Sequence, residues 1–204
     1  MSIEIQMYSY YNNFKRTMCK KKNEREIGNM IEMKVDSVRI NLATQSRIVI
    51  LKTVHTNQYL FIWIAPAEAY AIAVSLQKDH TTSSRPLTHD LITEVITQMN
   101  AKIITAIITD LIDEVFYANL VLDVGGRHIR VDSRPSDAIA IALRSDTPIY
   151  VMESVLEKAG VEFDQNEEID QNEETDQNEE KENLNAYRDF INNLDALDDF
   201  GKEK

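Results

Sequence analysis

A nine-residue pattern that begins at Pro66 recurs, in residue type and order, at Pro135. The two copies, PAEAYAIAV and PSDAIAIAL, both run proline, small residue, acid, alanine, apolar, alanine, isoleucine, alanine, branched apolar. An apolar or alternating run of strand character precedes each proline. Proline fits the first turn of a helix, and the helix dipole favours an acid there. The repeat therefore predicts two related strand-strand-helix units, with Glu68 and Asp137 at equivalent places.

The hydrophobic pattern of the rest of the sequence predicts a single α+β domain. We expect a mixed, largely antiparallel sheet with packed helices, because most predicted strand pairs are hairpins. A second helix should open near Pro86, since the apolar residues that follow have helical spacing, and Gly125-Gly126 predicts a tight hairpin turn. Phe61 and Trp63 lie in an apolar strand and are predicted to be core. The expected strands are 35–42, 47–54, 58–64, 103–109, 115–124, 127–132 and 147–151.

The charge divides the chain into a neutral body and an acidic tail. Residues 161–204 hold sixteen Asp and Glu against four Lys and Arg, a balance of −12, whereas residues 1–160 hold eighteen of each. A neutral body offers no general electrostatic attraction to nucleic acid, and the tail opposes it. The tail contains DQNEE three times, at Asp164, Asp170 and Asp176, and lacks the apolar content that would offset the entropy of ordering.

These features predict four segments. Residues 1–32 form an N-terminal arm, rich in basic and aromatic residues, that is expected to be disordered; binding of nucleic acid by the arm and translation from Met30 or Met33 are the alternatives. Residues 33–161 form the folded domain, and residues 162–182 an acidic linker. Residues 183–204 carry a short helix with Leu184, Tyr187, Ile191 and Leu194 on one face, which either docks on the body or binds a protein partner.

The cysteine count and the hydropathy indicate a cytoplasmic protein. Cys19 is the single cysteine, so an internal disulfide is excluded and a reducing compartment is expected. The chain has no run of about 18 apolar residues, which a membrane helix needs. No apolar segment follows the basic residues of the N-terminus, so a secretory signal is not expected.

Several acids, one histidine and several arginines are candidates for chemistry on phosphate. His89 with Asp90 could supply a general base or acid, and Asp132 and Asp137 are further candidate catalytic carboxylates. Asp110 and Asp132 are candidate metal ligands, with Mg²⁺ as a candidate cofactor. Asp113, Glu114 and Arg144 are further candidates. No paired-histidine or carboxylate-lysine motif of a known metal nuclease accompanies them.

Each candidate also has a plain structural explanation. Asp137 in a first helical turn is expected to cap its helix, as Glu68 would in the matching place. Asp132 could pair with Arg130 or Arg134, and His89 could be a surface or capping residue. Acids such as Asp110, Asp113 and Glu114 are ordinary beside a turn between strands.

Two Arg-Pro turns are the best candidates for binding phosphate. Arg85 precedes Pro86 and Arg134 precedes Pro135, so each guanidinium lies beside the free amides of a helix N-terminus, a combination that suits an anion. The alternative is that each arginine bonds a neighbouring carboxylate and holds the turn in place.

Five blocks of sequence, in order, resemble the bifunctional nuclease domain family between Met33 and Val161. They are VDSVRINL, YLFIWIAPAEAYAIAVSLQ, RPLTHDLI, ITDL with VFYANLVL, and VDSRPSDAIAIALRSDTPIYVMESVLEKAGV. The resemblance implies cleavage of both DNA and RNA and a compact α+β fold that self-associates, but it supplies no settled catalytic residues. The chain departs from the family at Ala65 and Ala67, where relatives have glycine and an aromatic. It also has Ile112-Asp113-Glu114 in place of a short basic, glycine-containing turn.

Two functions of different classes follow. The resemblance implies a nuclease, and the candidate residues that would surround its site are His89, Asp90, Asp110, Asp132, Arg134 and Asp137. The neutral body and the acidic tail favour instead a non-catalytic regulatory or protein-interaction module, dimeric through its sheet or its apolar helix faces.

Overall fold

Two antiparallel three-stranded meanders, each followed by a helix, build the body of the protein. The structure is a computed structural model that describes residues 29–41, 44–77 and 85–162. The first unit is β1 (Met30–Ile40), β2 (Arg47–Thr53), β3 (Gln58–Ile64) and α2 (Pro66–Leu76). After α3 (Thr88–Gln98), the second is β4 (Ala101–Ile112), β5 (Val115–Val124), β6 (Arg127–Ser133) and α4 (Pro135–Ser145). The chain continues through β7 (Ile149–Met152), α5 (Glu153–Ala159) and β8 (Gly160–Glu162).

The described strands form one eight-stranded sheet in the order β6-β5-β4-β7-β1-β2-β3-β8. Neighbours pair antiparallel except β4 and β7, which are parallel. The predicted α+β class with a mixed, largely antiparallel sheet is therefore confirmed. Each repeated unit contains three strands before its helix, at the positions expected from the sequence, and the last two strands with the helix make the predicted strand-strand-helix unit.

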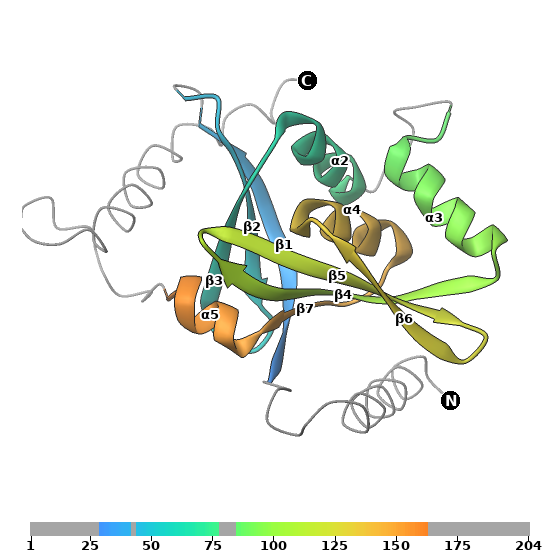
Figure 1. Ribbon diagram of the computed structural model, residues 1–204. Coiled ribbons are helices and arrows are strands. Elements are labelled where there is room, and N and C mark those ends of the chain that lie inside the picture. The colour runs from blue at the N-terminus through green and yellow to red at the C-terminus, as the bar shows by residue number, and fades with distance from the viewer. Residues whose placement is uncertain (1–28, 42–43, 78–84, 163–204) are drawn as a thin grey trace, which may run out of the picture.

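The helices α2, α4 and α3 lie side by side along one face of the sheet (Figure 1). Alanines dominate the contact, because Ala71 of α2 and Ala138, Ala140 and Ala142 of α4 are buried in the main core, and Ala69 of α2 is buried as well. Small side chains let the helices approach the sheet and each other closely, so the alanine spacing of the repeat sets the distance between the layers. No helix in the described ranges is long and apolar enough to cross a membrane.

The first strand begins at Met30, three residues before the predicted start of the domain. Met30–Met33 pair with Ile149–Met152 of β7, a partner more than a hundred residues away that local pattern does not reveal. The predictions for the rest of the arm, the acidic linker and the C-terminal helix concern residues 1–28 and 163–204, which lie outside the described residues.

Phe61 and Trp63, both predicted to be core, have different environments. Phe61 is buried at 4% exposure, as predicted, but Trp63 is 51% exposed, so its core assignment is wrong. Both side chains point to the face of β3 away from α2, and Trp63 lies opposite Ile48 near the start of β2. Ile48 on the same face is 0% exposed, so the exposure of Trp63 is specific to its own position, which alternation alone does not encode.

The β4–β5 turn stores backbone strain that a substitution should release. Asp113 and Glu114 both have left-handed φ angles, 47° and 63°, a conformation that favours glycine. We expect Glu114→Gly to raise the free energy of unfolding by about 0.5–1 kcal/mol in chemical denaturation, the relief of strain exceeding the added chain entropy. The matched control Glu94→Gly, in the interior of α3, should lower it by about 1 kcal/mol. A destabilised Glu114→Gly protein would contradict this account.

Candidate functional site

The first turns of α2, α3 and α4 meet around one arginine. Pro66 and Pro135 occupy the first helical positions of α2 and α4, which places Glu68 and Asp137 in equivalent first-turn positions, and His89 lies in the first turn of α3. Arg134, at the N-cap of α4, lies between the acids. Each helix end carries partial positive charge from its unpaired amides, so this convergence stabilises anionic groups.

A continuous chain of polar contacts joins the three helices. The Arg134 guanidinium binds Asp137 through Nε to Oδ2 at 2.8 Å and binds Glu68 through Nη2 to Oε1 at 2.7 Å. Nε2 of His89 lies 3.1 Å from Oδ1 of Asp137. The His89 side chain is 12% exposed, whereas that of Arg134 is 64% exposed, so the arginine forms the outer surface of the cluster.

The electrostatics keep Asp137 ionised near neutral pH. Burial raises the pKa of its carboxyl, but the hydrogen bonds from Arg134 and His89 and the charge of Arg134 outweigh it, so the pKa lies below the ordinary value. Hydrogen bonds to Asp137 and Glu68 in turn raise the pKa of Arg134. An ionised Asp137 accepts a hydrogen bond from Nε2 of His89, and that tautomer leaves Nδ1 as a proton acceptor.

Asp90 and Arg144 form a second ion pair that braces α3 against α4. Arg144 Nε donates to Asp90 Oδ1, and its Nη1 donates to the carbonyls of Ala71 and Ala140. Asp90 Oδ2 accepts from the backbone amide of Leu87, which closes the start of α3. Burial raises the pKa of Asp90, but the hydrogen bonds from Leu87 and Arg144 outweigh it and lower the pKa. The Arg144 side chain is 7% exposed, and its Nε and Nη1 are hydrogen-bonded within the fold, so among the candidate cations it is a structural brace.

The expected capping role of Asp137 is not what the structure shows. The N-cap of α4 has no side-chain hydrogen bond, and the recorded partners of the Asp137 carboxylate are the side chains of Arg134 and His89. For Arg134, the predicted alternative of a bond to a neighbouring carboxylate is confirmed. Among the described residues, Oε2 of Glu68 and Oγ of Ser133 are buried without a hydrogen-bond partner.

Asp132 lies away from this cluster. Its neighbour Ser133 pairs with Ala118, which packs in the core beneath α4, whereas Asp132 pairs with Asn119 on the other face. Because successive residues of a strand point to opposite faces, Asp132 points away from α4. The structure therefore does not bring Asp132 to His89.

Asp110 shares that outer face but is separated from Asp132 by β5. Asp110 pairs with Tyr117, and Asp132 pairs with Asn119, two residues further along β5. Strand spacing and rise put their Cα atoms roughly 12 Å apart, and direct Mg²⁺ ligation needs oxygen at about 2.1 Å. The pair does not fit a single directly bound ion. In the described parts of the chain, no group of three or more His, Cys, Asp or Glu could hold a metal.

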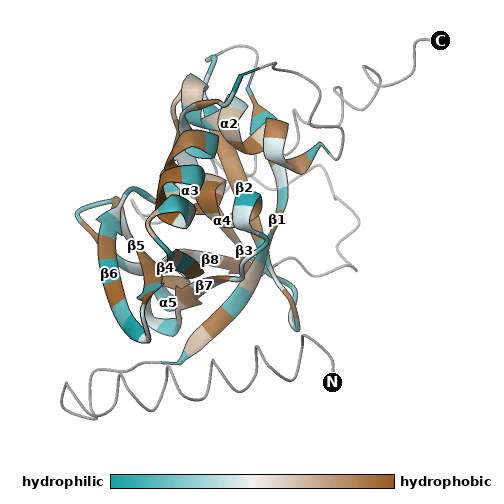
Figure 2. Cartoon of the chain, turned by 90° about the vertical axis from the view of Figure 1, so that its right-hand side faces the viewer, coloured by the Kyte–Doolittle hydropathy of each residue, from teal (hydrophilic) through white to brown (hydrophobic). Residues whose placement is uncertain are grey.

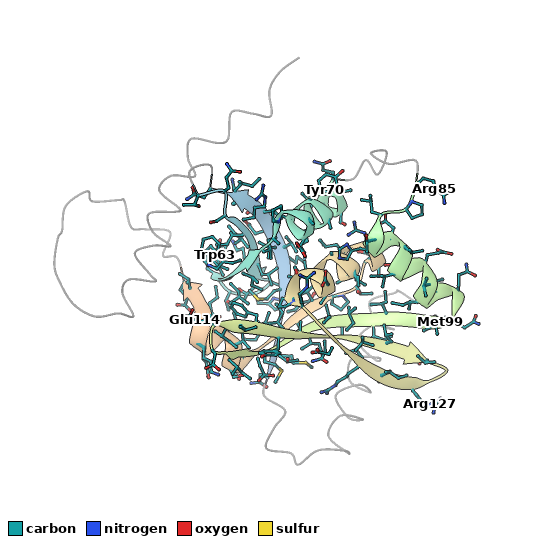
Figure 3. All side chains as sticks on the ribbon, turned by 45° about the horizontal axis from the view of Figure 1, so that its top comes forward. Trp63, Tyr70, Arg85, Met99, Glu114 and Arg127 are labelled. Atoms are coloured by element: carbon teal, nitrogen blue, oxygen red, sulfur yellow. The ribbon has the colours of Figure 1, made fainter. Side chains whose placement is uncertain are left out.

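The remaining candidates lie at the periphery. Arg85 is exposed where the chain leads into α3, and Asp113 and Glu114 form the tip of the β4–β5 hairpin, far from Arg127 at the other end of the meander (Figure 3). Sequence reasoning assigned Glu68 only a capping role and missed it as a partner of Arg134. The repeat carried the signal, because equivalent helices that pack against each other bring equivalent first-turn acids together.

The fold and the site define an α+β domain in which a carboxylate, an imidazole and a guanidinium meet at packed helix N-termini. The sequence profile of the bifunctional nuclease domain matches residues 49–164, and the chain belongs to that family. Two Mycobacterium tuberculosis proteins are similar to it, "Uncharacterized protein MT1877" of strain CDC 1551 / Oshkosh and "Uncharacterized protein Rv1829" of strain ATCC 25618 / H37Rv. Each is 41% identical over 132 residues, which cover 65% of this chain and 77% of the relative.

Proposed function

We propose that this protein hydrolyses phosphodiester bonds in DNA and RNA, with His89 as the proton-transfer group and Asp137 as the carboxylate that holds it. The observation that carries the proposal is the His89–Asp137 contact of 3.1 Å at the convergence of three helix N-termini. Membership of the bifunctional nuclease domain family supports the same reaction class. The protein would act in the cytoplasm, where its single cysteine stays reduced.

The proposed mechanism depends on the tautomer of His89, in which Nε2 carries the proton and Nδ1 is free to accept one. DNA has no 2′-hydroxyl, so an enzyme that cleaves both nucleic acids uses water as its nucleophile. Nδ1 of His89 accepts a proton as the water oxygen bonds to phosphorus, and Asp137 stabilises the imidazolium that forms. The P–O bond to the leaving oxygen then breaks, and the imidazolium returns the proton to that oxygen. The reaction consumes one water and yields two ends, one of them a phosphate monoester.

Arg134 and the helix ends would attract the phosphate. The guanidinium is 64% exposed, and the two carboxylates take its Nε and Nη2 hydrogens. Nη1 has no recorded contact with the described residues and faces an approaching anion in this proposal. Transition-state charge would be stabilised by this donor and by the helix dipoles, while Asp90 fixes the start of α3 and Arg85 adds positive charge at its entrance.

Single-stranded oligonucleotides of DNA and RNA test the proposal. We expect His89→Ala to lower the cleavage rate by about 100-fold or more, the usual contribution of a positioned acid or base. Asp137→Asn should act in the same direction, and His55→Ala, in the exposed β2–β3 loop, should cleave like the parent protein. Equal cleavage by the His89 and His55 variants would identify a contaminant and remove the nuclease assignment. The assay with and without EDTA tests the Mg²⁺ cofactor considered from the sequence, which the separation of Asp110 and Asp132 does not support.

A second candidate function is a dimeric interaction module, and α3 favours it. Leu91 and Val95 of this helix and Met99 at its C-cap form an apolar stripe, all three are exposed, and no residue of α3 is buried. Figure 2 shows apolar stretches on α3 and also on β6, the edge strand of the sheet. A homo-oligomer would cover such a stripe.

Sedimentation of matched variants tests the dimer. Val95→Asp places a charge in the stripe, and Thr97→Asp places the same charge on the exposed side of the helix away from it. We expect the parent and Thr97→Asp proteins to sediment as dimers and Val95→Asp as a monomer. A parent protein that sediments as a monomer at all concentrations would exclude this interface.

A further inference from the structure

The outer face of β2 and β3, opposite the helices, carries three apolar side chains that are almost completely shielded from solvent. Ile48 is 0% exposed, Ile50 8% and Phe61 4%. They form a cluster separate from the main core. Among the described residues, the partly buried apolar side chains that pack against this cluster are Tyr59 and Val161. The main core, by contrast, has α2 and α4 over it. The shielding of this outer-face cluster therefore needs a further covering segment.

Three basic side chains also lie on this face, near the cluster. Lys52 pairs with Tyr59, and Lys34 pairs with Lys52, so both lysines share the face of Ile50 and Phe61. Arg39 pairs with Ile48 and lies on this face as well. Lys52 Nζ lies 5.0 Å from the centre of the Tyr59 ring. The cover that fits this surface is thus apolar on one side and acidic around its edge.

The C-terminal part of the chain has that chemistry and leaves the domain beside the outer-face cluster. Residues 183–204 place Leu184, Tyr187, Ile191 and Leu194 at helical spacing and carry five acids against three basic residues. The linker of residues 163–182 adds ten acids against one lysine. β8 pairs with β3, and Val161 of β8 already packs on the cluster.

The linker length permits the contact. From β8 to β2 the sheet spans two strand spacings, about 10 Å. A flexible chain of the 20 linker residues has an end-to-end distance of about 25 Å. The tethered segment is therefore held at an effective concentration on the order of millimolar, which makes a modest apolar contact sufficient.

We propose that residues 183–204 pack as an amphipathic helix over Ile48, Ile50 and Phe61, with the acidic residues of the tail facing Lys34, Arg39 and Lys52. The tail is then an intramolecular clasp on the sheet face opposite His89. This contact is independent of the proposed nuclease activity, because it uses neither His89 nor its partners. The N-terminal arm and a second copy of the chain are the competing covers.

Trp63 reports on the contact in the full-length protein. It is the only tryptophan of the chain, lies two residues from Phe61 on the same face and is half exposed (Figure 3). Ile191→Asp should move its emission to longer wavelength and lower the melting temperature by several degrees. The matched control Asn193→Asp, on the opposite side of the helix, should change neither. Lys34→Glu should weaken the clasp in low salt, and Lys102→Glu, at an exposed position of β4, should not.

The following results would contradict the proposed packing of residues 183–204 on this face. Identical spectra and melting temperatures for the Ile191 and Asn193 variants would remove residues 183–204 as the cover. If Trp63 then shifts only on deletion of residues 1–28, the arm covers the face. If its emission depends on protein concentration and sedimentation gives a dimer, a second copy does.

Discussion

Replacing Ile139 by alanine is expected to lower the free energy of unfolding by about 3 kcal/mol, whereas Tyr70→Ala should change it by less than about 1 kcal/mol. The repeat makes these two residues equivalent, because each is the fifth residue counted from its proline. The structure separates them, since Ile139 is 0% exposed in the main core and Tyr70 is 57% exposed on α2 (Figure 3).

The size of the Ile139 effect comes from the cavity that the substitution leaves. Ile139 lies in the alanine-rich helix α4, and small neighbours cannot move to fill the space of a lost side chain. Tyr70→Ala removes an exposed ring and gains helix propensity, which offsets the small loss of contact. Chemical denaturation followed by circular dichroism measures both. Ile139→Val should lower the free energy of unfolding by only about 1 kcal/mol. Equal losses of stability in Ile139→Ala and Tyr70→Ala would contradict the assignment of α4 as the central helix.

Arg134→Met is expected to lower the free energy of unfolding by about 2 kcal/mol at neutral pH. The variant keeps the side-chain stem but leaves Glu68 and Asp137, both largely buried, without their shared cation. Complete burial would make this loss about 3–5 kcal/mol, and the 64% exposure of Arg134 reduces it. Arg127→Met, at the exposed β5–β6 turn, is the matched control and should cost less than about 0.5 kcal/mol.

The loss in Arg134→Met should depend on pH in a defined direction. In the parent protein the pKa of Asp137 is lowered, so the stability that its ionised form contributes is present above the unfolded pKa, about 3.9, and is lost as pH falls through the lower folded value. In the variant, the cation no longer outweighs the burial that raises the pKa of Asp137, and protonation of that carboxyl relieves its repulsion with Glu68. The difference between the two proteins should therefore be largest near pH 7 and shrink below about pH 4. Glu68→Gln should restore part of the stability of Arg134→Met, and a deficit that stays constant across pH would exclude the charge explanation.

The local sequence pattern was enough to predict most of the helices, strands and turns. The prolines at 66 and 135 begin α2 and α4 as predicted, and Gly125-Gly126 makes the tight β5–β6 turn with φ angles of 59° and 81°. These features depend on backbone stereochemistry within a few residues, so the sequence specifies them directly. The first strand was placed less well, because Met30–Glu32 become a strand only by pairing with β7.

The candidate site was predicted in part. His89, Asp137 and Arg134 were all proposed from the sequence, and the structure joins them in one network. Asp132, two residues before Arg134, was proposed with equal reason, yet strand alternation turns it to the other face. Which residues of a strand–turn–helix segment reach a common point depends on how the segment packs, and composition does not contain that information.

By itself the sequence determined the paired proline-led helices, the largely antiparallel sheet, the acidic tail and membership of a nuclease-like family, because each depends on residue types at short or repeated spacing. Only the tertiary structure decided that Glu68 and Asp137 share Arg134, that His89 closes the network and that Asp132 stays outside it. The physical reason is that packing α2 against α4 brings the two repeats face to face, and this contact joins residues that lie far apart along the chain.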